Sequence, residues 1–189
     1  IRNSEIGNKQ RIIKMMLKKK NIDWDTLGFD PIETRSMFVA NCPLEGEWTN
    51  GSLIPYGNIE LSPAAGVLNY GQGVFEGTKA YHTSKDNIVL FRIQRNAKRM
   101  AWSTKRMCIP EMNSDFFIHA VTKTVKDNID YIPPYGKGSL YVRPIVWGTA
   151  PALGVKAVSD YTFMVFVSPV GPYFKKGMRP LSLKVETDF

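Results

Sequence analysis

The chain has 189 residues, 43% of them hydrophobic, and carries a formal net charge of +8. This length suits one domain with a substantial core, or one domain and a piece of another. No run approaches the ~18 uninterrupted apolar residues of a membrane-spanning helix, so we expect no integral membrane protein. Cys42 and Cys108 lie far apart without a CxxC motif, which favours a reduced intracellular protein, and His82 and His119 lack the clustered partners of a structural zinc site.

The first predicted element is a basic amphipathic helix at residues 8–20, NKQRIIKMMLKKK. A basic patch also suits nucleic acid or an anionic lipid, so a solvated face and an anion-binding surface both stay open. No RNA-binding or helix-turn-helix signature accompanies it, and we expect no nucleic-acid partner. Because the chain begins with Ile1 and not Met, we expect a processed or cut product. Its compartment, whether cytoplasm, chloroplast or mitochondrion, would depend on an upstream segment.

Strand-like segments dominate the first half of the chain. Residues 37–42, MFVANC, predict a strand, and the Asn50-Gly51 pair beyond it is a strong hairpin signal. Residues 78–83 and 87–93 predict two further strands, joined by a polar turn.

Two helices and then more strands follow. Residues 94–107 predict a helix with many basic side chains, and a second helix begins with capping residues at 114–115. Residues 139–148 predict a strand in which Pro144 implies an edge position or a bulge, whereas 161–169 predict a central strand. This order predicts an α+β domain with a mostly antiparallel sheet.

A glycine-rich stretch, LNYGQGVFEG at residues 68–77, precedes the strand pair. Gly71, Gly73 and Gly77 have the spacing G-x-G-x-x-x-G, which fails the dinucleotide fingerprint, and the Gly-Lys-Ser/Thr of a Walker A loop is absent. Two interpretations remain: a glycine-permitted turn that carries exposed aromatic side chains, or a ligand site.

Three further places suggest ligand contacts, each with a structural alternative. Tyr141 and Arg143 share one strand face and suit recognition of a carboxylate, unless they are a surface arginine beside a packed tyrosine. Arg99 either clamps a phosphate or belongs to a solvated basic helix face. Leu153 and Val155 either line an apolar pocket or pack against the domain.

The order of these motifs resembles the branched-chain amino acid aminotransferases, which are pyridoxal-phosphate enzymes of fold type IV. The resemblance runs through NIDWDTLGF, GNIELSPAAGVLNYGQGVFEGTKAY, IVLFRIQRNAKRM, GSLYVRPIVWGTAPALGV and SPVGPYF, and covers roughly residues 21–189. It implies the small α+β domain of such an enzyme, with flanking helices, plus the start of the large domain. The implied boundaries are a basic extension at 1–20, the small domain at 21–168, an interdomain linker at 169–180 and a first strand of the large domain at 181–189.

The resemblance also implies pyridoxal 5′-phosphate as cofactor, with Arg99 holding its phosphate, and no metal. Leucine, isoleucine or valine is implied to give its amino group to the cofactor, and 2-oxoglutarate to receive it, in ping-pong order. The residues implied to line the substrate pocket are Phe29, Tyr70, Phe75, Tyr141, Arg143, Leu153, Val155 and Tyr173. Tyr141 and Arg143 are implied to lie near the substrate carboxylate. Leu153 and Val155 are implied to reach into a neighbouring subunit's site, and hence a homodimer.

The family's Schiff-base lysine marks a departure. In the family it lies downstream of the SPVGPYF linker, so we expect it beyond Phe189 and expect residues 1–189 alone to be inactive. Lys79 matches a different family position. Three alternatives stay open: a fold-type IV aminotransferase for methionine-derived oxo acids or D-amino acids, a truncated pseudoenzyme or interaction subunit that pairs through residues 149–155, and an anion-binding protein that uses residues 8–20.

Overall fold

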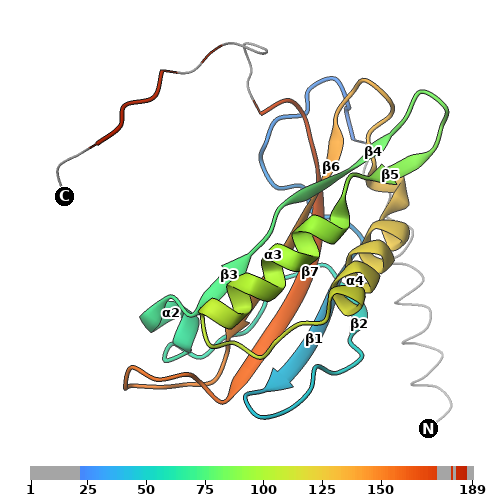
Figure 1. The fold of residues 1–189 in the computed structure, drawn as a ribbon. Coiled ribbons are helices and arrows are strands. Elements are labelled where there is room, and N and C mark those ends of the chain that lie inside the picture. Colours follow the sequence, from blue (N-terminus) through green and yellow to red (C-terminus); the bar gives the residue numbers. More distant parts are fainter. Residues whose placement is uncertain (1–21, 174–179, 181, 187–189) are drawn as a thin grey trace, which may run out of the picture.

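The computed structural model describes residues 22–173, 180 and 182–186, so the helix predicted at 8–20 lies outside the described residues. Figure 1 shows one sheet with two long helices on one of its faces. In the described chain the sheet has seven strands in the spatial order β2-β1-β7-β6-β4-β5, and β3 also pairs with β6. The strands are β1 (Ser36–Pro43), β2 (Ser52–Pro55), β3 (Gly73–Phe75), β4 (Thr78–His82), β5 (Ile88–Leu90), β6 (Ser139–Gly148) and β7 (Asp160–Val170).

The pairings described between these strands are all antiparallel, which confirms the α+β prediction with a mostly antiparallel sheet. β6 and β7 pair along their whole length at the centre of the sheet, so the central strand predicted at 161–169 is confirmed. The predicted hairpin is present as β1 and β2, and Gly51 before β2 has φ +65°, a conformation that favours glycine.

The helices α3 (Ile93–Arg106) and α4 (Ser114–Asp127) cover the same face of the sheet (Figure 1). Two shorter helical segments are α2 (Gly66–Tyr70), which precedes β3, and the 3-10 turn η1 (Ile129–Tyr131), which follows α4. The cap predicted at 114–115 is wrong by one residue, because the Asn113 side chain accepts the hydrogen bond from the Asp115 N–H (2.7 Å). Asn, Ser and Asp cap almost equally well, so the sequence alone did not separate these neighbours.

An aromatic core joins the helices to the sheet. Phe163 of β7 is fully buried, with its ring centroid 6.2 Å from that of Phe38 on β1 and 6.1 Å from that of Phe117 on α4. Each such side chain contributes about 1.5–3 kcal/mol when fully buried. The helix-covered face of the sheet is therefore structural, which leaves the opposite face and the β3–β4 side for ligands.

The prediction that Pro144 marks an edge or a bulge is wrong, because β6 is an interior strand. Opposite Pro144 the ladder is interrupted, since β3 ends at Phe75 and β4 begins at Thr78. The Pro144 C=O accepts from the Glu76 N–H (2.9 Å). In an antiparallel strand a residue's N and C=O face the same neighbour, so the missing N–H of Pro144 faces this interruption and leaves no ladder bond unmade.

The strand predicted at 181–189 is not formed by its described residues 182–186, which lie in no strand of the sheet. The boundaries of the small domain, the linker and the large domain stay predictions. Within the described ranges, no helix has both the length and the apolar character needed to cross a membrane.

Candidate functional site

The stretch 68–77 forms a helix end followed by a short strand. α2 ends at Tyr70, and Gly71 caps it in the left-handed conformation with φ 62°, its N–H donating back into the helix. A larger residue would be strained there, which accounts for the first glycine. β3 then sets Phe75 opposite Ile145 of β6. Because strand residues alternate between faces, the stretch presents side chains to both faces of the sheet.

Five predicted pocket residues lie in contact on the face opposite α3 and α4, and we call them the aromatic–arginine group: Phe29, Phe75, Tyr141, Arg143 and Tyr173. The Arg143 guanidinium carbon lies 4.5 Å from the ring centroid of Phe75 and 5.2 Å from that of Tyr141. Arg143 Nη2 donates to the Tyr141 hydroxyl (2.7 Å). Phe29 packs edge-on against Tyr141 (5.6 Å) and Tyr173 (5.0 Å). The alternation predicted for Tyr141 and Arg143 is therefore confirmed, and their partners are aromatic.

This group retains unused capacity for an anion. Arginine carries no acceptor, so the Tyr141 oxygen accepts from Arg143 and the phenolic hydrogen stays available for another group. Arg143 Nε is buried and has no hydrogen-bond partner within the described chain, a state that costs about 1–3 kcal/mol. Phe75 is 63% exposed, so the cation lies beside an open aromatic surface. Cation, hydroxyl and apolar wall together suit a small carboxylic acid with an apolar side chain.

Tyr70 and Leu153 form a separate contact. The Tyr70 hydroxyl donates to the Leu153 carbonyl (2.5 Å), and the Ala152 N–H donates to Ala64 (2.9 Å), so the loop after β6 is attached to α2. Leu153 is 91% exposed and Val155 is 88% exposed. The predicted pocket residues thus divide into two groups, and the described contacts join Tyr70 and Leu153 to each other and not to the aromatic–arginine group.

Sequence reasoning missed Gln72, which attaches the same loop from inside. Its side-chain amide donates to the Tyr161 hydroxyl (3.0 Å) and accepts from the Val158 N–H (3.3 Å), and its backbone carbonyl accepts from the Gly148 N–H (2.9 Å). Burial raises the pKa of Tyr161, and its hydrogen bond with Gln72 offsets part of that rise. Gln72 is 8% exposed, so this network holds the loop that carries Leu153 from a buried position.

Arg99, the predicted phosphate ligand, lies on α3 and pairs with Glu76. Its Nε and Nη2 donate to the two carboxylate oxygens of Glu76 at 2.8 and 2.7 Å, a side-on bidentate pair. The side chain of Arg99 is 60% exposed, whereas that of Glu76 is 9% exposed. The hydrogen bonds with Glu76, and then its charge, raise the pKa of Arg99. One edge of the Arg99 guanidinium is therefore bound to Glu76, and the rest of the side chain is exposed to solvent.

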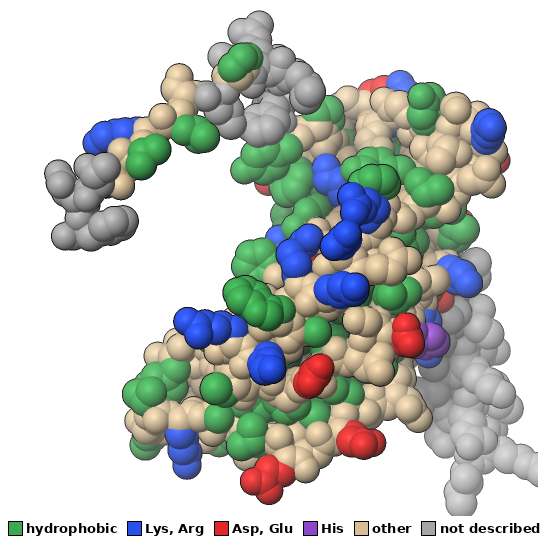
Figure 2. Space-filling view, viewed as in Figure 1, with side chains coloured by type: hydrophobic (Ala, Val, Ile, Leu, Met, Phe, Trp, Pro, Cys, Tyr) green, Lys and Arg blue, Asp and Glu red, His purple; other side chains and the backbone are tan. Residues whose placement is uncertain are grey.

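The exposed face of α3 is strongly basic. The helix has no acidic residue and contains the cations Arg95, Lys98, Arg99, Lys105 and Arg106. Figure 2 shows Lys and Arg side chains gathered along this helix, and a shallow depression of about 360 Å³ is lined by Arg95, Lys98, Arg99 and Trp102. An anion that reaches Arg99 would therefore meet a positive surface.

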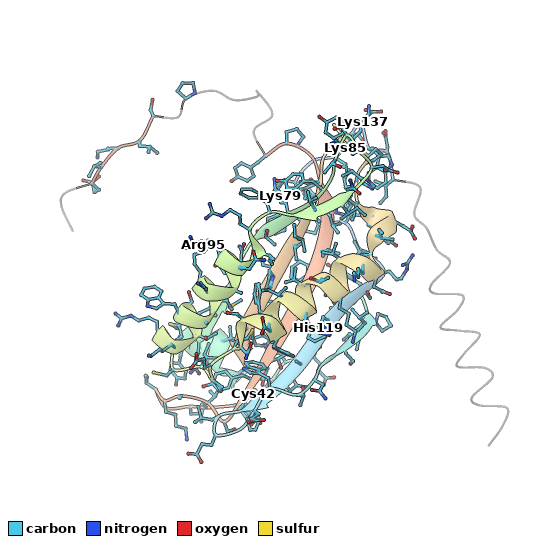
Figure 3. The ribbon with its side chains drawn as sticks, turned by 45° about the vertical axis from the view of Figure 1, so that its right-hand side comes forward. Cys42, Lys79, Lys85, Arg95, His119 and Lys137 are labelled. Carbon is cyan, nitrogen blue, oxygen red and sulfur yellow. The ribbon has the colours of Figure 1, made fainter. Side chains whose placement is uncertain are left out.

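Lys79 is the lysine that the structure sets beside the aromatic–arginine group. It lies on β4 directly opposite Tyr141 of β6, so the two side chains share one face of the sheet. Figure 3 shows Lys79 on β4 and Arg95 on α3, on neighbouring elements. The position adds positive charge beside the aromatic–arginine group and gives no reason to revise the expectation that the cofactor lysine lies elsewhere.

The sequence and the fold of this chain resemble those of known proteins. No protein-family model matches the chain. The chain is 52% identical over 170 residues to the chloroplastic branched-chain-amino-acid aminotransferase 3 of Arabidopsis thaliana. The aligned region covers 89% of this chain and 41% of that protein. It is 48% identical over 176 residues to the mitochondrial branched-chain amino acid aminotransferase 1 of Humulus lupulus, covering 93% of this chain and 45% of that protein.

Among solved structures, a T.th. branched-chain amino acid aminotransferase with pyridoxamine 5′-phosphate superposes with a TM-score of 0.58 at 27% identity, over 78% of this chain and 43% of that chain. In fold, the chain thus matches part of a fold-type IV aminotransferase. With about half of its residues identical to those of the plant proteins, it belongs to the branched-chain amino acid aminotransferase family. It spans about two fifths of the length of the first curated relative.

Proposed function

We propose that this chain carries substrate-binding residues of a pyridoxal 5′-phosphate-dependent branched-chain aminotransferase. Its substrates are leucine, isoleucine or valine as amino donors and 2-oxoglutarate as acceptor. The observation that supports this most is Arg143, which stacks on Phe75 and Tyr141 and donates to the Tyr141 hydroxyl, so that a cation and a hydroxyl lie beside the exposed ring of Phe75. A carboxylate suits that cation and the Tyr141 hydroxyl, while a branched aliphatic side chain suits the neighbouring rings.

The residues present fit the cofactor's phosphate. Arg99 Nη1 has no hydrogen-bond partner within the described chain, and the guanidinium stands on a positive helix face. The cofactor, when bound, supplies the electron sink through which the amino group is exchanged. Arg99 would hold the phosphate, Arg143 and Tyr141 would orient the substrate carboxylate, and Phe75 would exclude water from the substrate side chain.

A second copy of the chain would complete the pocket. Leu153 and Val155 are almost fully exposed on a loop that Tyr70 and Gln72 hold in place, so two aliphatic side chains are presented to solvent on a supported segment. Sedimentation at micromolar concentration tests this. We expect a dimer whose fraction falls in a Leu153→Ser, Val155→Ser double variant, and a monomer at every concentration would contradict it.

The activity is tested in a chimera. Residues 22–173 replace the matching segment of the Arabidopsis relative, and glutamate formation from leucine and 2-oxoglutarate is measured. Arg99→Ala should weaken cofactor binding by roughly tenfold to a hundredfold, because a hydrogen bond to a charged group is worth about 1.5–3 kcal/mol. Arg106→Ala is the matched control, because Arg106 is an exposed arginine of α3 outside the depression that Arg99 lines. A folded chimera that binds the cofactor but does not transaminate leucine would overturn the proposal.

The alternatives are separated by two further measurements. Methionine and D-leucine, offered to the same chimera, test for another substrate specificity. The 189-residue chain, mixed with pyridoxal 5′-phosphate, leucine and 2-oxoglutarate, should form no glutamate. Glutamate formation would show that the amino-group chemistry does not need a residue from elsewhere.

A further inference from the structure

Glu76 occupies an unusual position for a carboxylate. It lies in the interruption between β3 and β4, with its backbone N–H donating to Pro144 and its side chain turned toward α3. The carboxylate is 9% exposed and receives three charge-assisted or amide donors: Arg99 Nε (2.8 Å), Arg99 Nη2 (2.7 Å) and Asn96 Nδ2 (2.8 Å). Asn96 is itself buried and also donates to the Gly77 carbonyl (3.1 Å), so the carboxylate is fixed from two sides.

Glu76 binds only two of the three guanidinium nitrogens of Arg99, Nε and Nη2. A guanidinium has a side-on edge, made by Nε and one Nη, and an end-on edge, made by the two Nη atoms. Glu76 takes the side-on edge of Arg99, so Nη1 and the second hydrogen of Nη2 remain for another acceptor. Because the carboxylate is buried and the arginine is exposed, the free edge is turned away from the protein body toward solvent.

We propose that Glu76 is a positioning residue, held by Asn96, that fixes the side-on edge of Arg99 so that its end-on edge receives the cofactor phosphate. This inference rests on the proposed function, in which Arg99 binds that phosphate. An unrestrained arginine loses side-chain rotamer freedom when it binds an anion, and the bidentate pair with Glu76 removes part of that freedom beforehand.

A competing role for Glu76 predicts the opposite change in phosphate affinity when the carboxylate is removed. If the carboxylate only cancels the charge of Arg99, Glu76→Gln should raise the local positive potential and strengthen phosphate binding. If it positions Arg99, Glu76→Gln should weaken binding despite the gain in positive charge. Asn96→Ala sharpens the comparison, because it removes one of the three donors to the carboxylate without changing any charge on Glu76 or Arg99.

The experiment uses the 189-residue chain labelled with ¹⁵N-arginine. Hydrogen exchange of the Arg99 Nε–H is followed by NMR, and the same signal is titrated with pyridoxamine 5′-phosphate and with pyridoxamine. These amines form no Schiff base with surface lysines, and their difference isolates the phosphate. Glu60→Gln, which removes an exposed carboxylate, is the charge-matched control. Dispersed amide spectra establish that each variant is folded.

We expect slow Nε–H exchange and a phosphate-dependent shift in the wild type and in Glu60→Gln. In Glu76→Gln and Asn96→Ala, exchange should accelerate. The dissociation constant of pyridoxamine 5′-phosphate should rise by up to about tenfold, because Arg99 must then lose more side-chain rotamer freedom on binding. Equal or tighter binding in both variants, or unchanged Nε–H exchange, overturns the positioning role. In the wild type, the Arg99 Nε–H could stay protected while its signal shifts equally with pyridoxamine 5′-phosphate and with pyridoxamine. That result would refute the phosphate-binding role of Arg99, and the positioning role of Glu76 would fail for that separate reason.

Discussion

Replacing Gln72 by leucine should loosen the loop that carries Leu153. Leucine keeps most of the side-chain volume but makes neither the bond to the Tyr161 hydroxyl (3.0 Å) nor the bond from the Val158 N–H (3.3 Å). Val158 is 2% exposed, so an unpaired N–H there costs about 1–3 kcal/mol, and the lost tyrosine bond adds about 1 kcal/mol. Because the Val158 bond is long, we expect the lower end of this range, about 2 kcal/mol in total.

Urea unfolding followed by tryptophan fluorescence measures this loss. The Gln72→Leu midpoint should fall while the slope m stays unchanged, which identifies a change in stability and not in compactness. Gln94→Leu, at an exposed position of α3, is the matched control and should change the unfolding free energy by less than about 0.5 kcal/mol. Amide exchange at Val158 should also accelerate in Gln72→Leu. A loss below about 0.5 kcal/mol, with Val158 exchange unchanged, would refute the reasoning.

Three further outcomes follow from single contacts. Burial raises the pKa of Tyr161 above 10.0, so the folded chain keeps a proton that the unfolded chain loses. Its stabilising effect is complete below about pH 10 and is lost as the pH rises through the folded pKa, so the wild-type urea midpoint should fall more steeply above pH 10 than that of Tyr161→Phe. Asn113→Ala removes the α4 cap and should lower the unfolding free energy by about 1 kcal/mol in thermal melts, and an unchanged melt would contradict the cap. Gly77→Ala would set a Cβ 2.6 Å from the Tyr141 hydroxyl and should destabilise by about 1–3 kcal/mol with a shift of the Tyr141 ring signals, whereas Gly57→Ala, which meets nothing within 4 Å, should do neither.

The two long helices α3 and α4 and most strands could be predicted because each buries one face, and burial imposes a period on the sequence. The interior position of β6 could not be predicted from the sequence. Pro144 argues for an edge when only its own strand is considered, since the interruption that tolerates it lies in a different segment, between Phe75 and Thr78. Pairing partners are chosen by long-range packing, which local propensity does not contain.

In the candidate site, too, features set by local sequence could be predicted and features set by long-range contacts could not. Tyr141 and Arg143 could be placed on one face because alternation along a strand is local. Gln72 and Glu76 lie in a stretch whose glycines favour a turn. Their burial arises only when Tyr161 and Arg99, 89 and 23 residues further along, pack against them. The available signal is the composition of residues 71–77, GQGVFEG, in which an amide and an acid stand among glycines and apolar residues.

The interruption between β3 and β4 connects the two halves of the candidate site. Phe75 is the last residue of β3 and faces Arg143, while Glu76, one residue later, faces α3 and holds Arg99. An unbroken strand would extend the ladder opposite Pro144, where no N–H is available, so the break costs less here than elsewhere. Because alternation separates the two side chains, loss of the Glu76 carboxylate should leave the stacking of Arg143 on Phe75 intact. Ring-current shifts of the Phe75 signals should therefore stay the same in Glu76→Gln, and a change in them would show that the phosphate and substrate contacts are coupled through the backbone of this stretch.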